Sequence, residues 1–179
     1  MLVIDKAIAP PTSKKSGVAT PKFRGKNYFY MGLILLLLLG IFIANEWRWA
    51  WLSELQADDV YKQLSGFAIL TYLAHQWHCS VLRNRGLMRL AGRLIHRHKL
   101  IGSLAPLVFF THSQTMGFGY LQLLSLVYFA LFLTGLFNVE TTAIRHAWFH
   151  PVWVMVHVSL ATALLFLLGY HIYISYAYQ

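Results

Sequence analysis

Long apolar runs separated by short polar stretches make up most of the chain from Tyr28 onward. A helix needs roughly 20 mainly apolar residues to cross the hydrocarbon core of a bilayer, which is about 30 Å thick. The pattern therefore predicts an all-α fold, a polytopic membrane helical bundle with about five transmembrane helices. We expect these helices at residues 28–45, 65–82, 98–116, 120–137 and 151–175.

The stretch from Leu100 to Phe137 is almost free of charge and is too long for one span. As a single helix it would measure about 57 Å, roughly twice the thickness of the hydrocarbon core. We therefore expect a break at Met116-Gly-Phe-Gly119, where glycines permit a tight turn. Pro106 lies midway along the third span and predicts a kink there.

The polar stretches predict how the bundle is oriented. Residues 1–27 are basic and contain paired prolines, and we expect a cytoplasmic tail there, followed by a single transmembrane domain at 28–179. Residues 46–64 are acidic and predict a loop or a short surface helix. Residues 83–99 are basic and predict an amphipathic helix on the membrane surface. With the N-terminus inside, thirteen of the fifteen Lys and Arg residues lie on the cytoplasmic side, in accord with the positive-inside rule.

The composition agrees with a membrane protein. Apolar residues make up 58% of the 179 residues and charged residues only 12%, against roughly 25% charged in a soluble domain. The net charge of +9 lies in the tail and the loops, which favours membrane topology over nucleic-acid binding. The first apolar run is long enough to span and follows a polar tail, unlike a secretory signal peptide. We expect a multi-pass protein in contact with lipid, most simply in a bacterial inner membrane.

Two pairs of histidines share one spacing. His98 and His112, like His157 and His171, are fourteen residues apart within an apolar span. That spacing brings two side chains within about 40° of one helix face and about 21 Å apart along the axis. With a break near Gly117 the third and fifth spans run parallel, so His98 faces His157 and His112 faces His171. An unbroken helix would instead pair His98 with His171.

Each histidine pair predicts the two axial ligands of one haem iron. A haem that only transfers electrons takes two strong ligands, such as neutral imidazoles. The single cysteine, Cys79, excludes covalent attachment through a Cys-x-x-Cys-His motif, so we expect two non-covalent haem b groups. A zinc or copper site is disfavoured because the paired histidines of one helix are too far apart to meet at one ion. Small residues predicted on the ligand faces are Gly102, Ala105, Ala161 and Gly169.

Further residues are candidates for supporting roles. Secondary ligand candidates are His75, His78, His96 and His150. The first two lie three residues apart near the end of the second span, where solvation or a bond to a haem propionate would also explain them. Candidates for neutralising propionates or docking an anionic donor are Arg93, Arg97 and Arg145.

The segments His96-Arg-His98-Lys-Leu-Ile-Gly102 through His112 and His157 through His171 resemble the ferric reductase-like transmembrane domain superfamily. That superfamily includes NADPH oxidases, metalloreductases and the haem subunit of methionine sulfoxide reductase systems. The resemblance covers about residues 65–178. It implies two b-type haems between the third and fifth helices, and electron flow outward from a cytoplasmic flavin. No flavin or nicotinamide domain follows before Gln179, so we expect a separate electron-donor protein or a larger membrane complex.

The leading hypothesis is a di-haem b cytochrome subunit that carries electrons from a cytoplasmic, flavin-type donor to an acceptor on the outer side. The second hypothesis is a cytochrome b anchor of a respiratory complex that exchanges electrons with quinone. Antiparallel ligand helices would favour it. The third is a non-redox membrane scaffold or assembly protein in which the histidines are structural.

Overall fold

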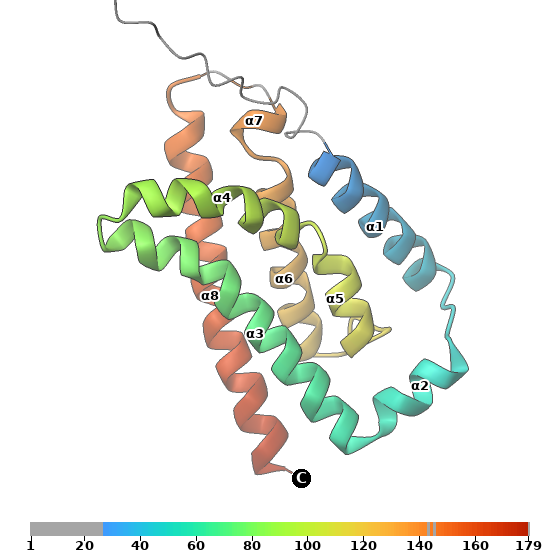
Figure 1. The fold of residues 1–179 in the computed structure, drawn as a ribbon. Coiled ribbons are helices and arrows are strands. Elements are labelled where there is room, and N and C mark those ends of the chain that lie inside the picture. The colour runs from blue at the N-terminus through green and yellow to red at the C-terminus, as the bar shows by residue number, and fades with distance from the viewer. Residues whose placement is uncertain (1–26, 143, 145, 179) are drawn as a thin grey trace, which may run out of the picture.

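The computed structural model describes residues 27–142, 144 and 146–178, so the predicted tail and Arg145 lie outside the described residues. Within this part the regular elements are all helices, which confirms the all-α class (Figure 1). They are α1 (Asn27–Ala44), α2 (Ala50–Ala57), α3 (Asp59–Asn84), α4 (Met88–Gly102), α5 (Ala105–His112), α6 (Tyr120–Leu136), α7 (Val139–Thr142) and α8 (Phe149–Ala177).

The helices form one bundle with α1 and α8 at opposite edges (Figure 1). The long helix α8 packs chiefly against α6, whereas α3 and α4 form an antiparallel hairpin, and α5 packs between α1 and α3. The short helix α2 lies at the same end of the bundle as the C-terminus, and α7 lies at the other end. Helix α4 lies across the bundle, so within the predicted third span only α5 runs along the length of the bundle (Figure 1).

Aromatic residues of α5 and α6 form the centre of the core. Phe109 packs on Phe129 with ring centroids 4.8 Å apart, and Tyr128 and Phe132 are buried beside them. Helix α1 approaches this core at the buried residue Gly32, where an added Cβ would meet Leu136 Cδ1 at 3.0 Å. The small residue at this position therefore allows α1 to pack closely on α6.

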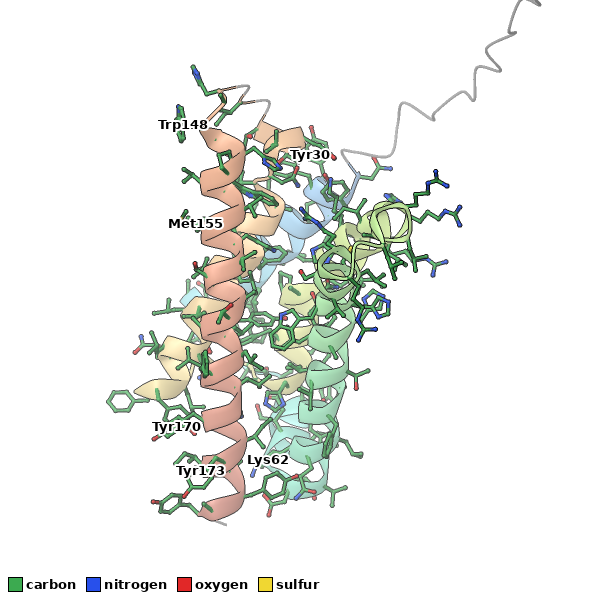
Figure 2. The ribbon with its side chains drawn as sticks, turned by 90° about the vertical axis from the view of Figure 1, so that its left-hand side faces the viewer. Tyr30, Lys62, Trp148, Met155, Tyr170 and Tyr173 are labelled. Carbon is green, nitrogen blue, oxygen red and sulfur yellow. The ribbon has the colours of Figure 1, made fainter. Side chains whose placement is uncertain are left out.

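Two helices in the described part of the chain, α1 and α8, are long and apolar enough to cross a membrane. Leu164 is the buried residue of α8, whereas apolar side chains are exposed along most of this helix. Figure 2 shows Trp148 and Met155 projecting away from the neighbouring helices, and Tyr170 and Tyr173 gathered towards the C-terminal end. An apolar surface of this extent is typical of contact with lipid or with a partner.

Helices occupy four of the five predicted spans, and the third is different. The spans at 28–45, 120–137 and 151–175 match α1, α6 and α8 within two residues, and 65–82 lies inside the longer α3. The prediction of one helix at 98–116 is wrong. Helix α4 joins most of the predicted surface helix at 83–99 to the start of this span. A second helix within the span, α5, ends at His112.

Pro106 explains the break between α4 and α5. A proline has no N–H to donate to the carbonyl of Gly102, four residues earlier, and its ring clashes with that carbonyl. Tyr72 Oη donates to the Gly102 carbonyl instead, at 3.2 Å, and Tyr128 Oη donates to the carbonyl of Ala105 at 2.9 Å. Pro106 itself lies in the first turn of α5, where its missing N–H costs little. The expected kink is therefore a complete break that two tyrosines stabilise.

The predicted break before α6 is confirmed. Gly117 and Gly119 have φ angles of +72° and +60°, in the left-handed region that favours glycine, and α6 begins at Tyr120. Ser125 Oγ donates to the carbonyl of Met116 at 3.0 Å and ties this turn to α6. The turn reverses the chain, so that the α4–α5 segment and α8 run in the same direction.

Candidate cofactor site

The four histidines of the predicted haem sites lie as two pairs. The ring centroids of His98 and His157 are 6.5 Å apart with an interplanar angle of 74°. Those of His112 and His171 are 6.4 Å apart with an interplanar angle of 85°. Helices α4 and α5 supply one member of each pair and α8 supplies the other. The alternative pairing of His98 with His171 does not occur.

These separations suit two imidazoles that share a metal ion. Nitrogen–metal bonds of about 2 Å on both sides of one ion place two imidazole centroids about 6.4 Å apart. A direct hydrogen bond between the rings would bring the centroids to about 5 Å. Both observed distances exceed that of a direct hydrogen bond and leave room for an ion between the rings.

Each pair lines its own cavity. His98 and His157 line a cavity of about 340 Å³, here called the His98 cavity, and His112 and His171 line one of about 510 Å³, the His112 cavity. Cofactor sites commonly have volumes of about 300–1,000 Å³ and mainly apolar walls. Leu73 and Tyr128 line both cavities and so form the wall between them.

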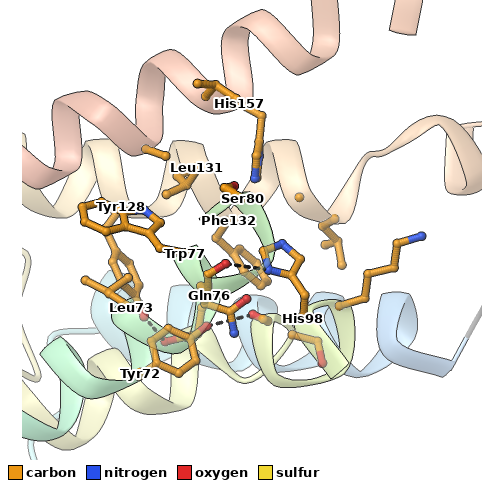
Figure 3. A pocket seen from close by; sticks show the side chains of 18 of the residues that line it. Tyr72, Leu73, Gln76, Trp77, Ser80, His98, Tyr128, Leu131, Phe132 and His157 are labelled. Atoms are coloured by element: carbon orange, nitrogen blue, oxygen red, sulfur yellow. Dashed lines mark hydrogen bonds between the residues drawn. The ribbon is translucent and has the colours of Figure 1, made fainter. Parts of the chain in front are cut away.

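The partner of the His98 ring fixes which of its nitrogens carries the proton. His98 Nδ1 lies 3.2 Å from the backbone carbonyl of Gln76, and Figure 3 shows this bond beside His157, which points into the cavity from α8. A carbonyl can only accept, so Nδ1–H of the neutral ring is the donor and Nε2 carries a free lone pair. Metal-binding histidines characteristically have this arrangement.

Two hydroxyl groups bind Nδ1 of His157 and His112, as the Gln76 carbonyl does for His98. Thr134 Oγ1 donates its proton to the carbonyl of Leu131 at 2.8 Å, so it accepts from His157 Nδ1, also at 2.8 Å. Ser65 Oγ donates to the carbonyl of Lys62 at 3.2 Å and accepts from His112 Nδ1 at 2.9 Å. Both rings therefore leave Nε2 unprotonated.

The fourth histidine differs from the other three. His171 Nδ1 is buried and has no hydrogen-bond partner within the described part of the chain. Its ring lies 6.2 Å from that of Tyr120. On α8, in contrast, the His157 ring stacks on Trp153 at 5.3 Å, and Trp153 Nε1 donates to the Thr134 carbonyl at 2.7 Å. The His157 ring is thus fixed on two sides and the His171 ring is less constrained.

A tertiary cap holds the end of α5, where His112 lies. Gln56 Nε2 donates to the carbonyls of Phe110 and Thr111 at 2.9 and 3.1 Å. Tyr61 Oη donates to the carbonyl of Thr111 at 2.7 Å. These carbonyls belong to the last turn, which has no partners of its own within the helix. Side chains from α2 and α3 therefore fix the helix end that presents His112.

Small residues give the rings room, although only partly as predicted. Gly102, Ala105 and Ala161 line the His98 cavity as expected, whereas Gly169 lines neither cavity. Sequence analysis missed Gly135 and Gly66, where an added Cβ would lie 3.5 Å from His157 Cε1 and 3.7 Å from His112 Cε1.

A repeated dipeptide could have identified these glycines. Each follows directly after the hydroxyl residue that binds the same histidine, as Ser65-Gly66 in α3 and Thr134-Gly135 in α6. A hydroxyl residue followed by glycine in two different apolar helices is the signal. At each site this dipeptide places the hydroxyl that accepts from Nδ1 next to a glycine, whose missing side chain leaves room beside the imidazole.

The supporting candidates that the structure describes lie outside both cavities. Arg93 and Arg97 are exposed and line neither cavity, so they do not reach the space beside the histidines. The cation that lines the His98 cavity is Lys99. The four secondary candidates are likewise exposed and line neither cavity: His75, His78, His96 and His150.

No three His, Cys, Asp or Glu side chains in the described residues form a group that could hold a metal ion. Each site therefore offers two protein ligands. Haem fits this donor set, because its macrocycle supplies the remaining four ligands and the protein supplies only the axial ones.

No protein-family model matches the chain, and neither a curated protein nor a solved structure matches it. The functional interpretation therefore rests on the geometry of the two histidine pairs.

Proposed function

We propose that the chain is a membrane di-haem b cytochrome subunit that carries electrons across the bilayer. His98 and His157 would hold one haem, and His112 and His171 the other. A single observation carries the proposal: two histidine pairs, each with ring centroids 6.4–6.5 Å apart, each line a separate apolar cavity.

A haem bound in each cavity would supply a one-electron redox centre. The side chains of this chain bind and orient such a group. The Nδ1 partners Gln76, Thr134 and Ser65 keep Nε2 of three imidazoles unprotonated and aim the rings. The walls of both cavities are mainly apolar, and the two histidines at each site would occupy the coordination positions that the macrocycle leaves free, so that none would remain for a substrate. The sites are thus suited to electron transfer.

The same proposal assigns the chain to a bacterial inner membrane with its N-terminus in the cytoplasm. Helices α1, α3, α6 and α8 would cross it, and the end of α4, α5 and the loop at 113–119 would together form the remaining crossing. His157 and His171 are fourteen residues apart on one helix, or about 21 Å along its axis. Two sites at that separation fit within one bilayer, whose apolar core is about 30 Å thick.

The electron donor would be a separate cytoplasmic protein, with a flavin as the source of electrons. Helix α4 carries exposed basic residues that support docking of an acidic partner at the end of the bundle where the His98 cavity lies. They are Arg89, Arg93 and Arg97. The acceptor would lie beyond the His112 cavity, at the opposite end.

The quinone-linked alternative would be favoured by antiparallel ligand helices. The pairing of His98 with His157 and of His112 with His171 requires parallel ligand segments instead, which supports the leading proposal. A non-redox scaffold predicts a purified chain without haem absorbance.

A reduced-minus-oxidised absorption spectrum of the purified full chain, with haem counted per polypeptide, tests the function. We expect two non-covalent, low-spin b-type haems. His157→Ala and His171→Ala should each leave one haem, and the two variants should keep haems of different midpoint potential. His78→Ala, at an exposed histidine outside both cavities, is the matched control and should keep both.

The absence of haem from protein made in a haem-supplying host would refute the proposal and favour a scaffold. A chain that keeps both haems in His157→Ala and in His171→Ala would show that other residues are the ligands.

A further inference from the structure

Lys99 is the basic residue that lines the His98 cavity. It follows the ligand candidate His98 directly, and its side chain is only 16% exposed. Arg93 and Arg97, on the same helix, are exposed and outside the cavity. A cation in this position interacts with charge inside the cavity across protein rather than across water, so its effect is less screened.

A carboxylate and an aromatic ring surround the Lys99 ammonium group. Glu140 of α7 forms an ion pair with it, and Nζ lies 5.6 Å from the centroid of the Tyr28 ring on α1. The Glu140 side chain is 65% exposed, so it can turn into solvent at little cost. The two contacts link α4 to α7 and to α1 at the end of the bundle where the His98 cavity lies.

We propose that Lys99 anchors a carboxylate of the cofactor in the His98 cavity and that Glu140 competes for it. The Lys99–Glu140 ion pair neutralises the lysine while the cavity is empty. A carboxylate-bearing macrocycle takes the place of Glu140 when it binds, and Glu140 turns outward. This inference rests on the proposed function, because it names the anionic group that one of the two haems would present.

The chemistry of the site favours an ammonium–carboxylate contact. A half-buried ammonium group binds a carboxylate through charge-assisted hydrogen bonds, which are about twice as strong as neutral ones. The remaining walls of the cavity are mainly apolar and suit the body of a macrocycle. Tyr28 can retain its contact with the Lys99 ammonium after the carboxylates exchange.

The experiment uses the full chain and changes one charge at a time. Lys99→Met should release one of the two haems on the order of tenfold faster to an excess of haem-free globin, as expected for the loss of one charge-assisted bond. It should also lower the midpoint potential of that haem, because removing a nearby positive charge favours the oxidised form. Lys99→Arg should restore both properties.

Glu140→Gln gives the opposite prediction at an exposed position that is not expected to affect folding. Removing the competing carboxylate should slow the loss of the same haem and raise its midpoint potential. Arg97→Met removes a positive charge from the exposed face of α4 and is the matched control. It should leave the release rate and both potentials unchanged.

The outcomes separate this inference from the proposed function. A wild-type chain without haem refutes the proposed function and this inference with it. A wild-type chain with two haems, combined with a Lys99→Met variant that behaves like Arg97→Met, refutes only the role of Lys99. A Glu140→Gln variant that loses haem faster contradicts the competition.

Discussion

At the scale of single residues, the protonation state of three of the four candidate ligands depends on one neighbour each. The Gln76 carbonyl and the hydroxyls of Thr134 and Ser65 accept from Nδ1 of three histidines, and this leaves Nε2 of each ring able to bind metal. Such partners also raise the basicity of a metal-bound imidazole. His171 has no such partner in the described residues, so the two pairs are not equivalent.

Thr134→Val tests this dependence at His157. Valine keeps the shape of threonine but cannot accept from Nδ1, and the loss of such a partner typically lowers metal-site affinity by about 10–100-fold. We expect weaker binding of one haem and a higher midpoint potential for it, because the imidazole donates less charge. The measurement is an optical redox titration with haem quantification.

Thr162→Val provides the control, because the Thr162 hydroxyl donates only to the carbonyl of Val158 and lies in the wall of the same cavity. This variant should titrate like the wild type. Equal potentials in Thr134→Val and wild type would mean that the hydroxyl does not tune the ligand.

At the scale of helices, α5 depends on contacts with its neighbours. It has eight residues, and isolated helices shorter than about 12 residues are marginal in water. Pro106 begins it, and Gln56 and Tyr61 cap its last carbonyls. Gln114, which is 3% exposed, accepts from the Trp49 amide and holds the chain just beyond α5. The position of His112 therefore depends on α2 and α3.

Gln56→Leu should remove the cap without changing the size of the side chain much. The Phe110 carbonyl would lose its side-chain donor, whereas the Thr111 carbonyl would keep Tyr61. Leaving a half-buried carbonyl unpaired costs about 1–3 kcal/mol, and the end of α5 should fray. We expect the haem bound by His112 and His171 to be lost preferentially while the other is kept, as read from haem content and spectra.

Gln122→Leu is the matched change on the exposed side of α6, outside both cavities. It should retain two haems. If Gln56→Leu also retains two haems with unaltered spectra, the cap does not position His112.

At the scale of the whole molecule, the two cavities lie on the side of α8 that faces α3. The side of α8 that faces away from the bundle is exposed. Residues of α3 and α8 line both cavities. The exposed apolar side chains of α8 include Met155, Phe166 and Tyr173. One helix thus presents ligands on one face and a surface suited to lipid on the other.

Phe166→Asp tests whether this surface faces lipid. Phe166 is exposed and lies in the middle of α8, and an acidic residue there should cost about 2.5–3.5 kcal/mol of insertion. We expect less chain in the membrane fraction after alkaline extraction.

Trp148→Asp, directly before α8, should insert normally, because this position lies at the end of the helix. Equal insertion of the two variants would indicate that α8 does not face lipid at Phe166.

The sequence alone was enough to predict the helical class, the boundaries of α1, α6 and α8 within two residues, and the turn at Gly117 and Gly119. These features depend on local properties: runs of apolar residues, and glycines that adopt positive φ. The equal spacing of His98–His112 and His157–His171 also identified the four residues that meet in pairs. Helical periodicity explains this for His157 and His171, which share α8, but not for His98 and His112, which lie on the separate helices α4 and α5.

Only the tertiary structure decided the features that depend on contacts between distant segments. The break before Pro106 is complete because Tyr72 and Tyr128 satisfy carbonyls there, and these tyrosines lie 30 and 23 residues from their partners. Lys99 replaces Arg93 and Arg97 at the His98 cavity because the direction of α4 sets which basic residue turns inward. Helical periodicity places Arg93 and Arg97 on one face of α4 and Lys99 on the opposite side, but only the packing of α4 shows which of these faces turns towards the cavity.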